Sequence, residues 1–104
     1  MKYRLLITDR ALDDLRCIRD YIAHDSADRA AKFLEKLLDR LDALEQFPHG
    51  FALAREDDLV PYELRQFVYR PYRILYRVVG GTVEILHVRH GARGGASKRE
   101  LPSD

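Results

Sequence analysis

Residues 73–90 read RILYRVVGGTVEILHVRH, two runs of β-forming residues separated by the pair Gly80-Gly81. Residues 73–79 and 82–90 are rich in Val, Ile, Leu and Tyr, which is typical of strands. A two-residue turn between antiparallel strands favours glycine, because glycine adopts positive φ without steric cost. The segment therefore predicts a β-hairpin with positive φ at both glycines.

A further strand is expected before this hairpin, over residues 62–69, because Pro71 interrupts the pattern and cannot donate to a strand ladder. Alternation along residues 73–79 separates two faces of the sheet, one apolar and one mixed. The apolar face carries Ile74, Tyr76 and Val78, and the mixed face carries Arg73, Leu75, Arg77 and Val79.

The N-terminal half predicts one short strand followed by two helices. Residues 3–8 form the strand candidate, and Thr8-Asp9 is suited to capping a helix. Ser26 interrupts the first helical pattern and can cap a second helix, which ends near residues 47–50. Apolar residues recur at helical spacing at Leu12, Leu15, Ile18 and Ile22, and again at Ala30, Leu34, Leu37, Leu38, Leu41 and Leu44. Two helices joined by so short a turn should pack antiparallel.

The element order predicts an α+β fold with an N-terminal strand, an antiparallel helical hairpin and a three-stranded antiparallel meander. With 104 residues, the chain is expected to form a single domain over residues 1–93. Residues 51–60 have no consistent period and are interpreted as a surface loop. Residues 94–104 are rich in glycine and charge and are expected to be a flexible C-terminal tail.

Bulk composition indicates a cytoplasmic globular protein. Apolar residues make up 46% and charged residues 34% of the chain. We find neither an apolar run of membrane-spanning length nor a signal-peptide pattern. Cys17 is the only cysteine, which excludes an internal disulfide, and it is expected to be a helix packing residue.

Charge is divided unevenly along the sequence. Residues 1–60 contain 10 basic and 13 acidic residues, a net charge of −3, whereas residues 61–104 contain 8 and 4, a net charge of +4. A basic half of this kind can face phosphate or an acidic partner. Alternatively, the arginines solubilise a strand face and the two halves neutralise each other.

Basic residues of the second half cluster in the region predicted to form the sheet, at Arg65, Arg70, Arg73, Arg77, Arg89 and Arg93. Guanidinium groups bind phosphate with two parallel hydrogen bonds, and nearby aromatic rings can stack on bases. The same arginines would equally suit an acidic protein partner. A nucleic-acid surface and a protein interface therefore both remain open.

The histidines do not predict a metal site. His87 and His90 are three residues apart, which in a strand places them on opposite faces, and no third ligand is evident. We expect no metal and no cofactor. His90 could act as a general acid or base, with Arg65 or Arg93 stabilising phosphate charge. Alternatively, His90 is structural and bonds to the backbone.

Taken together, four segments resemble the RelE/ParE toxin superfamily, and the resemblance spans residues 3–93. The segments are residues 11–22, the helix end at residues 44–50, the strand at residues 72–78, and the strand with its His-Gly-Ala-Arg end at residues 83–93. The order and spacing of the four segments carry the match.

This resemblance implies a toxin of a type II toxin–antitoxin system, held inactive by a cognate antitoxin that wraps its helices and sheet. Members similar to RelE cleave messenger RNA in the ribosome without a metal ion. Members similar to ParE poison DNA gyrase. A hetero-oligomer with the antitoxin is expected in either case.

The sequence matches only some of the functional residues of the RelE-like nucleases. Arg65 resembles one functional arginine of the RelE-like nucleases, and Arg93 falls near a second. Their paired lysines have no counterpart in residues 51–63, and no tyrosine follows Tyr76 to match their C-terminal tyrosine. His90 could substitute for that tyrosine.

The His-Gly-Ala-Arg setting of His90 is closer to the ParE branch, so the first hypothesis is a non-enzymatic gyrase inhibitor. Its target-binding candidates are Arg65, Arg73, Arg77, Arg89 and Arg93. The second hypothesis is a metal-free endoribonuclease, acting on messenger RNA at the ribosome through Arg65, His90 and Arg93. The third is a protein-binding module that is not toxic.

Overall fold

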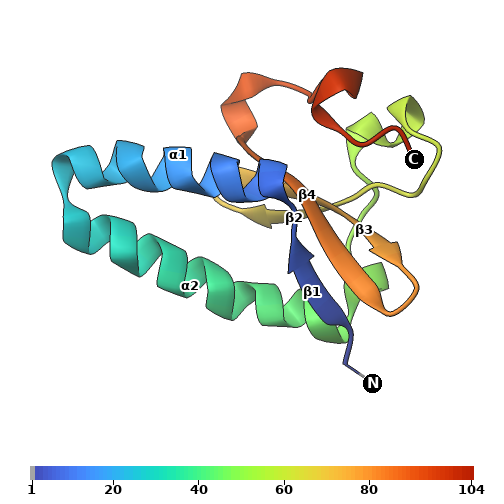
Figure 1. The fold of residues 1–104 in the computed structure, drawn as a ribbon, viewed down its shortest axis with the longest axis horizontal. Helices are drawn as coiled ribbons and strands as arrows, with labels where there is room; N and C mark the ends of the chain where they lie inside the picture. The colour runs from blue at the N-terminus through green and yellow to red at the C-terminus, as the bar shows by residue number, and fades with distance from the viewer. Residues whose placement is uncertain (1) are drawn as a thin grey trace.

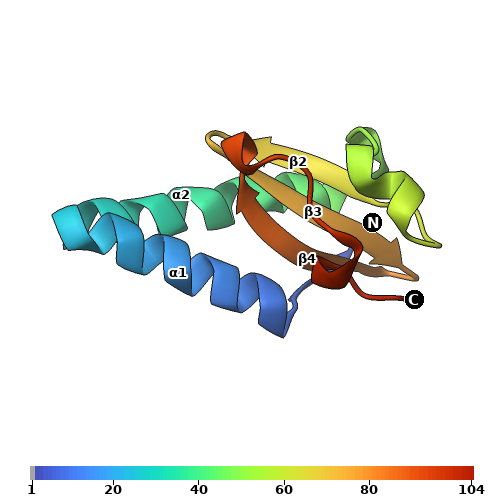
Figure 2. The same ribbon diagram turned by 90° about the horizontal axis from the view of Figure 1, so that it is seen from above.

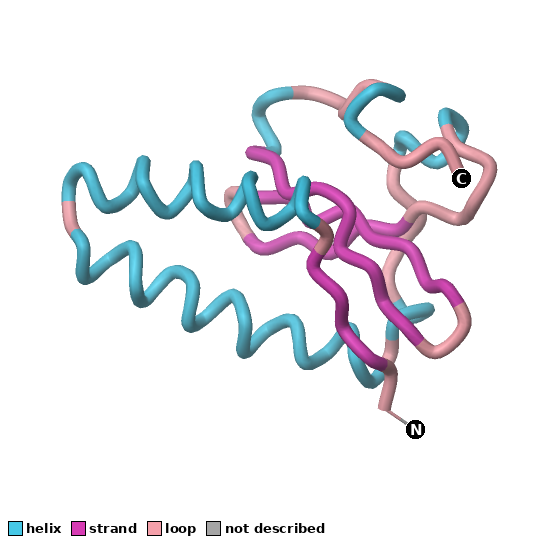
Figure 3. Tube along the Cα trace, in the orientation of Figure 1, coloured by secondary structure: helices cyan, strands magenta, loops and turns pink. Residues whose placement is uncertain are grey.

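A computed structural model describes residues 2–104 and confirms the α+β fold. Two helices lie against one face of a four-stranded sheet (Figure 1, Figure 3). The elements are β1 (Arg4–Ile7), α1 (Asp9–Asp25), α2 (Ala27–Gln46), β2 (Arg65–Tyr69), β3 (Tyr72–Val79) and β4 (Thr82–His90). Short 3-10 helices occupy Pro48–Gly50, Arg55–Leu59, Gly91–Arg93 and Lys98–Glu100.

The sheet has the strand order β1-β4-β3-β2. Strands β2, β3 and β4 form the predicted antiparallel meander. Strand β1 lies parallel to β4 and pairs only with Thr82 to Ile85, which makes the sheet mixed. The second half of β4 therefore has no strand on that side, and α1 lies along it (Figure 1).

The expected caps set the beginnings of both helices. The Thr8 hydroxyl accepts a hydrogen bond from the Ala11 amide at 3.3 Å, and the Ser26 hydroxyl accepts one from Arg29 at 3.2 Å. Figure 2 shows that α1 and α2 run side by side on one face of the sheet. Their apolar stripes meet the face of β3 that carries Ile74 and Tyr76 in one core cluster.

The hairpin turn differs from the expectation in one detail. Gly80 has a φ of 58°, whereas Gly81 is not in the positive-φ region. Positive φ at the first central residue alone is the pattern of a type II′ turn, which also matches the twist of antiparallel strands. The prediction of positive φ at both glycines was therefore wrong.

The other face of the sheet is covered by segments in which the sequence shows no helical or strand periodicity. A second apolar cluster there comprises Ala54, Leu64, Leu75, Leu86, Ala96 and Leu101. Two of its members, Ala96 and Leu101, belong to residues 94–104, the segment expected from its composition to be a flexible tail. The Tyr62 hydroxyl also donates to the Pro102 carbonyl at 2.8 Å.

Two further expectations from the sequence are corrected. Glu56 belongs to the segment interpreted as a surface loop, but it is only 2% exposed because it forms an ion pair with Arg73 of the sheet. Cys17 is exposed on α1 and does not pack in the helix core.

Neither α1 nor α2 is long and apolar enough to cross a membrane.

Candidate functional site

Arg65 lies at the start of β2 on the helix-facing side of the sheet. It alternates in phase with the buried Phe67 and pairs across the ladder with Tyr76. Its guanidinium donates to the Phe51 carbonyl at 2.7 Å and to Glu63 at 3.0 Å. Arg65 thereby links the start of β2 to the segment that follows the helices.

Arg73 lies on the opposite face of the sheet and is almost completely buried. It donates two hydrogen bonds to the carboxylate of Glu56, at 2.8 and 2.7 Å, and two more to the Gln66 side-chain oxygen. Burial raises the pKa of the Glu56 carboxyl, but the hydrogen bonds from Arg73 and from the Ala96 amide outweigh it and hold the pKa at about 2. Arg73 is therefore part of a buried ion pair.

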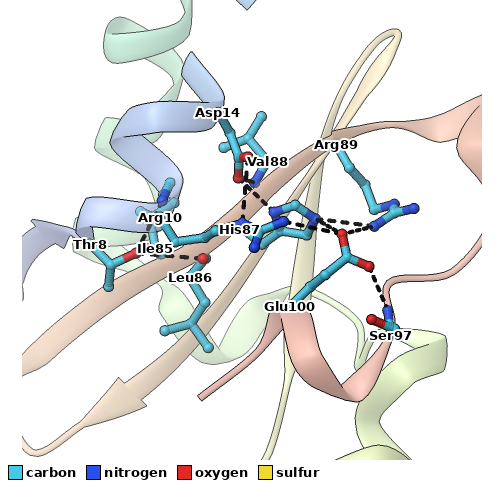
Figure 4. A network of polar contacts seen from close by, with 11 residues as sticks. Thr8, Arg10, Asp14, Ile85, Leu86, His87, Val88, Arg89, Ser97 and Glu100 are labelled. Atoms are coloured by element: carbon cyan, nitrogen blue, oxygen red, sulfur yellow. Dashed lines mark hydrogen bonds and ion pairs between the residues drawn. The ribbon is translucent and has the colours of Figure 1, made fainter. Parts of the chain in front are cut away.

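Arg89 and His87 form a second buried polar network, shown in Figure 4. The Nη1 atom of Arg89 donates to Glu100 at 2.9 Å and lies 3.1 Å from Nε2 of His87. Nε2 of His87 also lies 3.3 Å from the carboxylate of Glu100, which belongs to the C-terminal segment. Hydrogen bonding by the Ser97 amide and hydroxyl, with the charge of Arg89, lowers the pKa of Glu100 to about 2 against the opposing effect of burial.

Asp14 joins the same network to α1. Its Oδ2 atom lies 2.6 Å from Nδ1 of His87 and accepts a hydrogen bond from the Val88 amide at 3.0 Å (Figure 4). Val88 is in the half of β4 that β1 does not reach, so the carboxylate satisfies an amide at a strand edge. Asp14 therefore binds α1 to β4.

Arg77 completes the set of arginines whose charge is neutralised within the fold. It donates to Glu84 on the neighbouring strand at 2.7 Å, and its guanidinium lies 4.6 Å from the ring centre of Tyr62. Of the five target-binding candidates, four are thus engaged by carboxylates of this chain. Arg93 is the one candidate of the five that makes neither a hydrogen bond nor an ion pair within the described residues 2–104.

His90 and Arg93 share one cavity at the end of β4, with a volume of about 580 Å³. The His90 ring packs edge-on against Tyr72, and its Nδ1 atom accepts a hydrogen bond from the Ala92 amide at 3.0 Å. The structural role considered for His90 is therefore present. The walls are formed by Asp14, Cys17, Ile18, Tyr21, Pro71, Tyr72, Val88 and Arg89.

The three nuclease candidates do not converge. Arg65 is level with Tyr76 in the sheet, and His90 is level with Tyr72, so the two lie about 13 Å apart along the strands. His90 and Arg93 are neighbours, but Arg65 contacts a different cavity together with Arg77. A single phosphate could not contact all three side chains in this arrangement.

His87 and His90 occupy opposite faces of β4, in register with Leu75 and Tyr72. Among the described residues, no group of three or more potential metal ligands comes together.

Residues 5–94 match the family model described as the ParE toxin of the type II toxin–antitoxin system parDE. This match covers most of the chain. The chain belongs to the ParE toxin family.

Similar proteins carry names from both branches of the superfamily. Toxin RelE2 of Caulobacter vibrioides is 39% identical over 90 residues, which cover 83% of this chain and 92% of the relative. The chain is thus a toxin-family protein of the RelE/ParE superfamily. The names of these relatives do not separate the two activities.

Solved structures support the fold of this ParE-family chain. The chromosomal ParDE system of P. aeruginosa aligns with a TM-score of 0.69 at 24% identity, covering 86% of this chain and 96% of the other. The toxin–antitoxin complex RelBE2 of Mycobacterium tuberculosis aligns with a TM-score of 0.54 at 24% identity, covering 86% and 99%.

Sequence reasoning missed the carboxylates that neutralise the arginines of this toxin-family chain. Glu56 and Glu100 lie in segments without hydrophobic periodicity, 17 and 11 residues from Arg73 and Arg89. The available signal was the position of Arg73 and Arg89 within predicted strands, since a guanidinium that a sheet buries requires an acidic partner.

Proposed function

We propose that this protein acts as a ParE-type toxin that inhibits DNA gyrase and is neutralised by a cognate antitoxin. The observation that carries the proposal is the dispersal of the nuclease candidates. Arg65 is separated from His90 and Arg93, and its guanidinium is occupied by Phe51 and Glu63. Phosphate-transfer chemistry without a metal needs an acid, a base and a cation around one phosphate.

The antitoxin half of the proposal is supported by an apolar groove between the helices. Leu12 and Leu38 are 37% and 54% exposed, although both belong to the apolar stripes of α1 and α2. Arg16 and Arg19 border the groove, whose remaining walls are Ile7, Leu15, Leu34 and Leu37. An antitoxin segment with apolar residues flanked by carboxylates would cover this surface. Its carboxylates would compete with Asp13 and Asp20 for the two arginines, whose present ion pairs are solvent-exposed and therefore weak.

The proposal is tested by expressing the chain alone from an inducible promoter in a bacterial host. A gyrase inhibitor should induce the SOS response and filamentation before protein synthesis falls. With purified proteins, it should reduce supercoiling by gyrase and increase cleaved DNA, and co-purified antitoxin should reverse both effects. Normal growth at a verified level of folded protein would contradict the proposal.

A RelE-like ribosome-dependent endonuclease is the second candidate, favoured by the name of the relative Toxin RelE2 and by the shared cavity of His90 and Arg93. It predicts rapid translation arrest with messages cut inside ribosomes. Primer extension on a reporter message, sampled within minutes of induction, distinguishes the two: new 5′ ends without SOS induction would replace the gyrase proposal with the nuclease.

A further inference from the structure

The cavity at the end of β4 combines apolar walls with hydrogen-bond donors that the fold does not use. We name it the His90 cavity, after the histidine at its rim. Ile18 and Val88 contribute apolar surface, while Tyr21 and Tyr72 contribute rings with hydroxyl groups. A cavity of this composition fits a large apolar side chain that is joined to a polar group.

The free donors of the His90 cavity favour a negatively charged group. Arg93 is exposed and has no carboxylate partner within the described residues, in contrast to Arg73 and Arg89. The Nδ1 atom of His90 accepts a hydrogen bond from the Ala92 amide, so in the neutral ring the proton is on Nε2, which can act as a donor. Burial, together with the nearby Tyr21 hydroxyl, raises the pKa of Tyr72, so its hydroxyl also stays protonated.

The surroundings restrict how much negative charge the site can accept. Helix α1, which forms one wall, contains five aspartates and three arginines. The one carboxylate that lines the cavity, Asp14, is already bonded to His87 and Val88. A polyphosphate backbone would approach the other aspartates of α1 with few free cations to compensate, whereas one carboxylate can pair with Arg93.

We propose that the His90 cavity binds an acidic peptide segment of a protein partner, in which a large apolar side chain is adjacent to a carboxylate. The apolar side chain lies against Ile18, Val88 and the two tyrosines. The carboxylate accepts hydrogen bonds from Arg93 and from Nε2 of His90. This binding activity does not depend on whether gyrase or messenger RNA is the target of the toxin.

The position of Cys17 permits a direct test on the purified full-length protein. Cys17 is the only cysteine of the chain, it is exposed, and it lines the cavity. Small probes attached to it through thiol–disulfide exchange are held at high effective concentration, so that weak binding becomes measurable. The probes are phenylalanyl-glutamate and phenylalanyl-glutamine on the same cysteamine linker, and thymidine monophosphate on that linker as the nucleotide comparison.

The measured quantity is the concentration of competing thiol that releases half of each probe, determined by intact-protein mass spectrometry. We expect the glutamate probe to withstand about fivefold more competing thiol than the glutamine probe, as one partly exposed ion pair would give. Arg93→Ala should remove most of this preference, because only the hydrogen bond from His90 remains. Arg99→Ala, which removes an exposed arginine of the same terminal region outside the cavity, should preserve it.

Three results would overturn the proposal. Equal retention of the glutamate and glutamine probes would show that the cavity does not recognise a carboxylate. An undiminished preference in Arg93→Ala would place the recognition elsewhere. Stronger retention of the nucleotide probe than of the glutamate probe would assign the cavity to nucleic acid.

Discussion

At the scale of single residues, Arg73 shows how a charge in the sequence is neutralised inside the fold. Its side chain is 11% exposed, and the carboxylate of Glu56 matches the guanidinium with two hydrogen bonds. A buried guanidinium without a partner would be strongly unfavourable, so burial and pairing occur together. The basic character of residues 61–104 is therefore a poor guide to the charge on the protein surface.

Replacing Glu56 with Gln should destabilise the protein by about 3 kcal/mol, because the variant keeps the shape of the side chain but leaves Arg73 buried without a counter-charge. Urea unfolding followed by circular dichroism measures the loss. Glu63→Gln is the matched control, since Glu63 pairs with Arg65 while its own side chain is 67% exposed. Its expected loss is below about 1 kcal/mol. Equal losses in the two variants would contradict this account of Arg73.

The same carboxylates predict a dependence of stability on acid. The pKa of Glu56 and that of Glu100 are each lowered from 4.5 to about 2 in the folded protein. A lowered pKa stabilises the fold fully above the unfolded value, and this stabilisation is lost as the pH falls from about 4.5 towards 2. Melting temperatures recorded between pH 2 and pH 6 should fall over this window. The slope should be shallower in Glu56→Gln, and parallel curves would show that Glu56 does not contribute.

At the scale of elements, the features predicted from the sequence are those set by neighbouring residues. Thr8 and Ser26 cap helices because hydroxyl groups accept from free amides at a helix start, a rule that requires only local sequence. Periodicity likewise predicted the helical hairpin and the meander. The parallel pairing of β1 with β4 was not predicted, because it joins Arg4–Ile7 to residues 82–85 across the whole chain.

The two helix caps should differ in their effect on stability. The Thr8 hydroxyl caps α1 and also donates to the Ile85 carbonyl at 2.7 Å, whereas the Ser26 hydroxyl only caps α2. Thr8→Ala should therefore cost about 2 kcal/mol and Ser26→Ala about 1 kcal/mol in urea unfolding. Thr8→Ser retains both hydrogen bonds and serves as the control. A larger loss for Ser26→Ala would mean that the bond to Ile85 adds nothing.

At the scale of the whole molecule, the main departure from the sequence expectation is the covered second face of the sheet. The composition of residues 94–104 indicates a tail, and only two of these residues, Ala96 and Leu101, enter the apolar cluster. Their partners include Leu64, Leu75 and Leu86, which come from three distant segments. No local pattern encodes such contacts, since they exist only after the meander has formed. The same distinction holds for the candidate site. The proximity of His90 and Arg93 follows from their closeness in sequence, whereas the distance between Arg65 and His90 depends on the strand register, which the sequence does not give.

Removal of residues 94–104 should consequently destabilise the domain, although these residues follow the last strand. Truncation after Arg93 exposes the apolar cluster on this face of the sheet. It also removes Glu100, the partner of His87 and Arg89, and the hydrogen bond from the Ala96 amide to Glu56. Leu101→Ala alone should cost about 2 kcal/mol through the lost burial, and the truncation should cost more. Urea unfolding gives both values, and binding of a dye for exposed apolar surface should increase in the truncated protein.

Arg99→Ala is the control for the truncation, because an exposed side chain of the same segment should change stability by less than about 0.5 kcal/mol. A truncated protein that unfolds at the wild-type urea concentration would mean that residues 94–104 do not stabilise the sheet. We expect the loss of stability to be smallest in Arg99→Ala, intermediate in Leu101→Ala and largest in the truncated protein. This order would show that the C-terminal segment is an integral layer of the domain, because its apolar and acidic side chains cover the face of the sheet that the helices leave exposed.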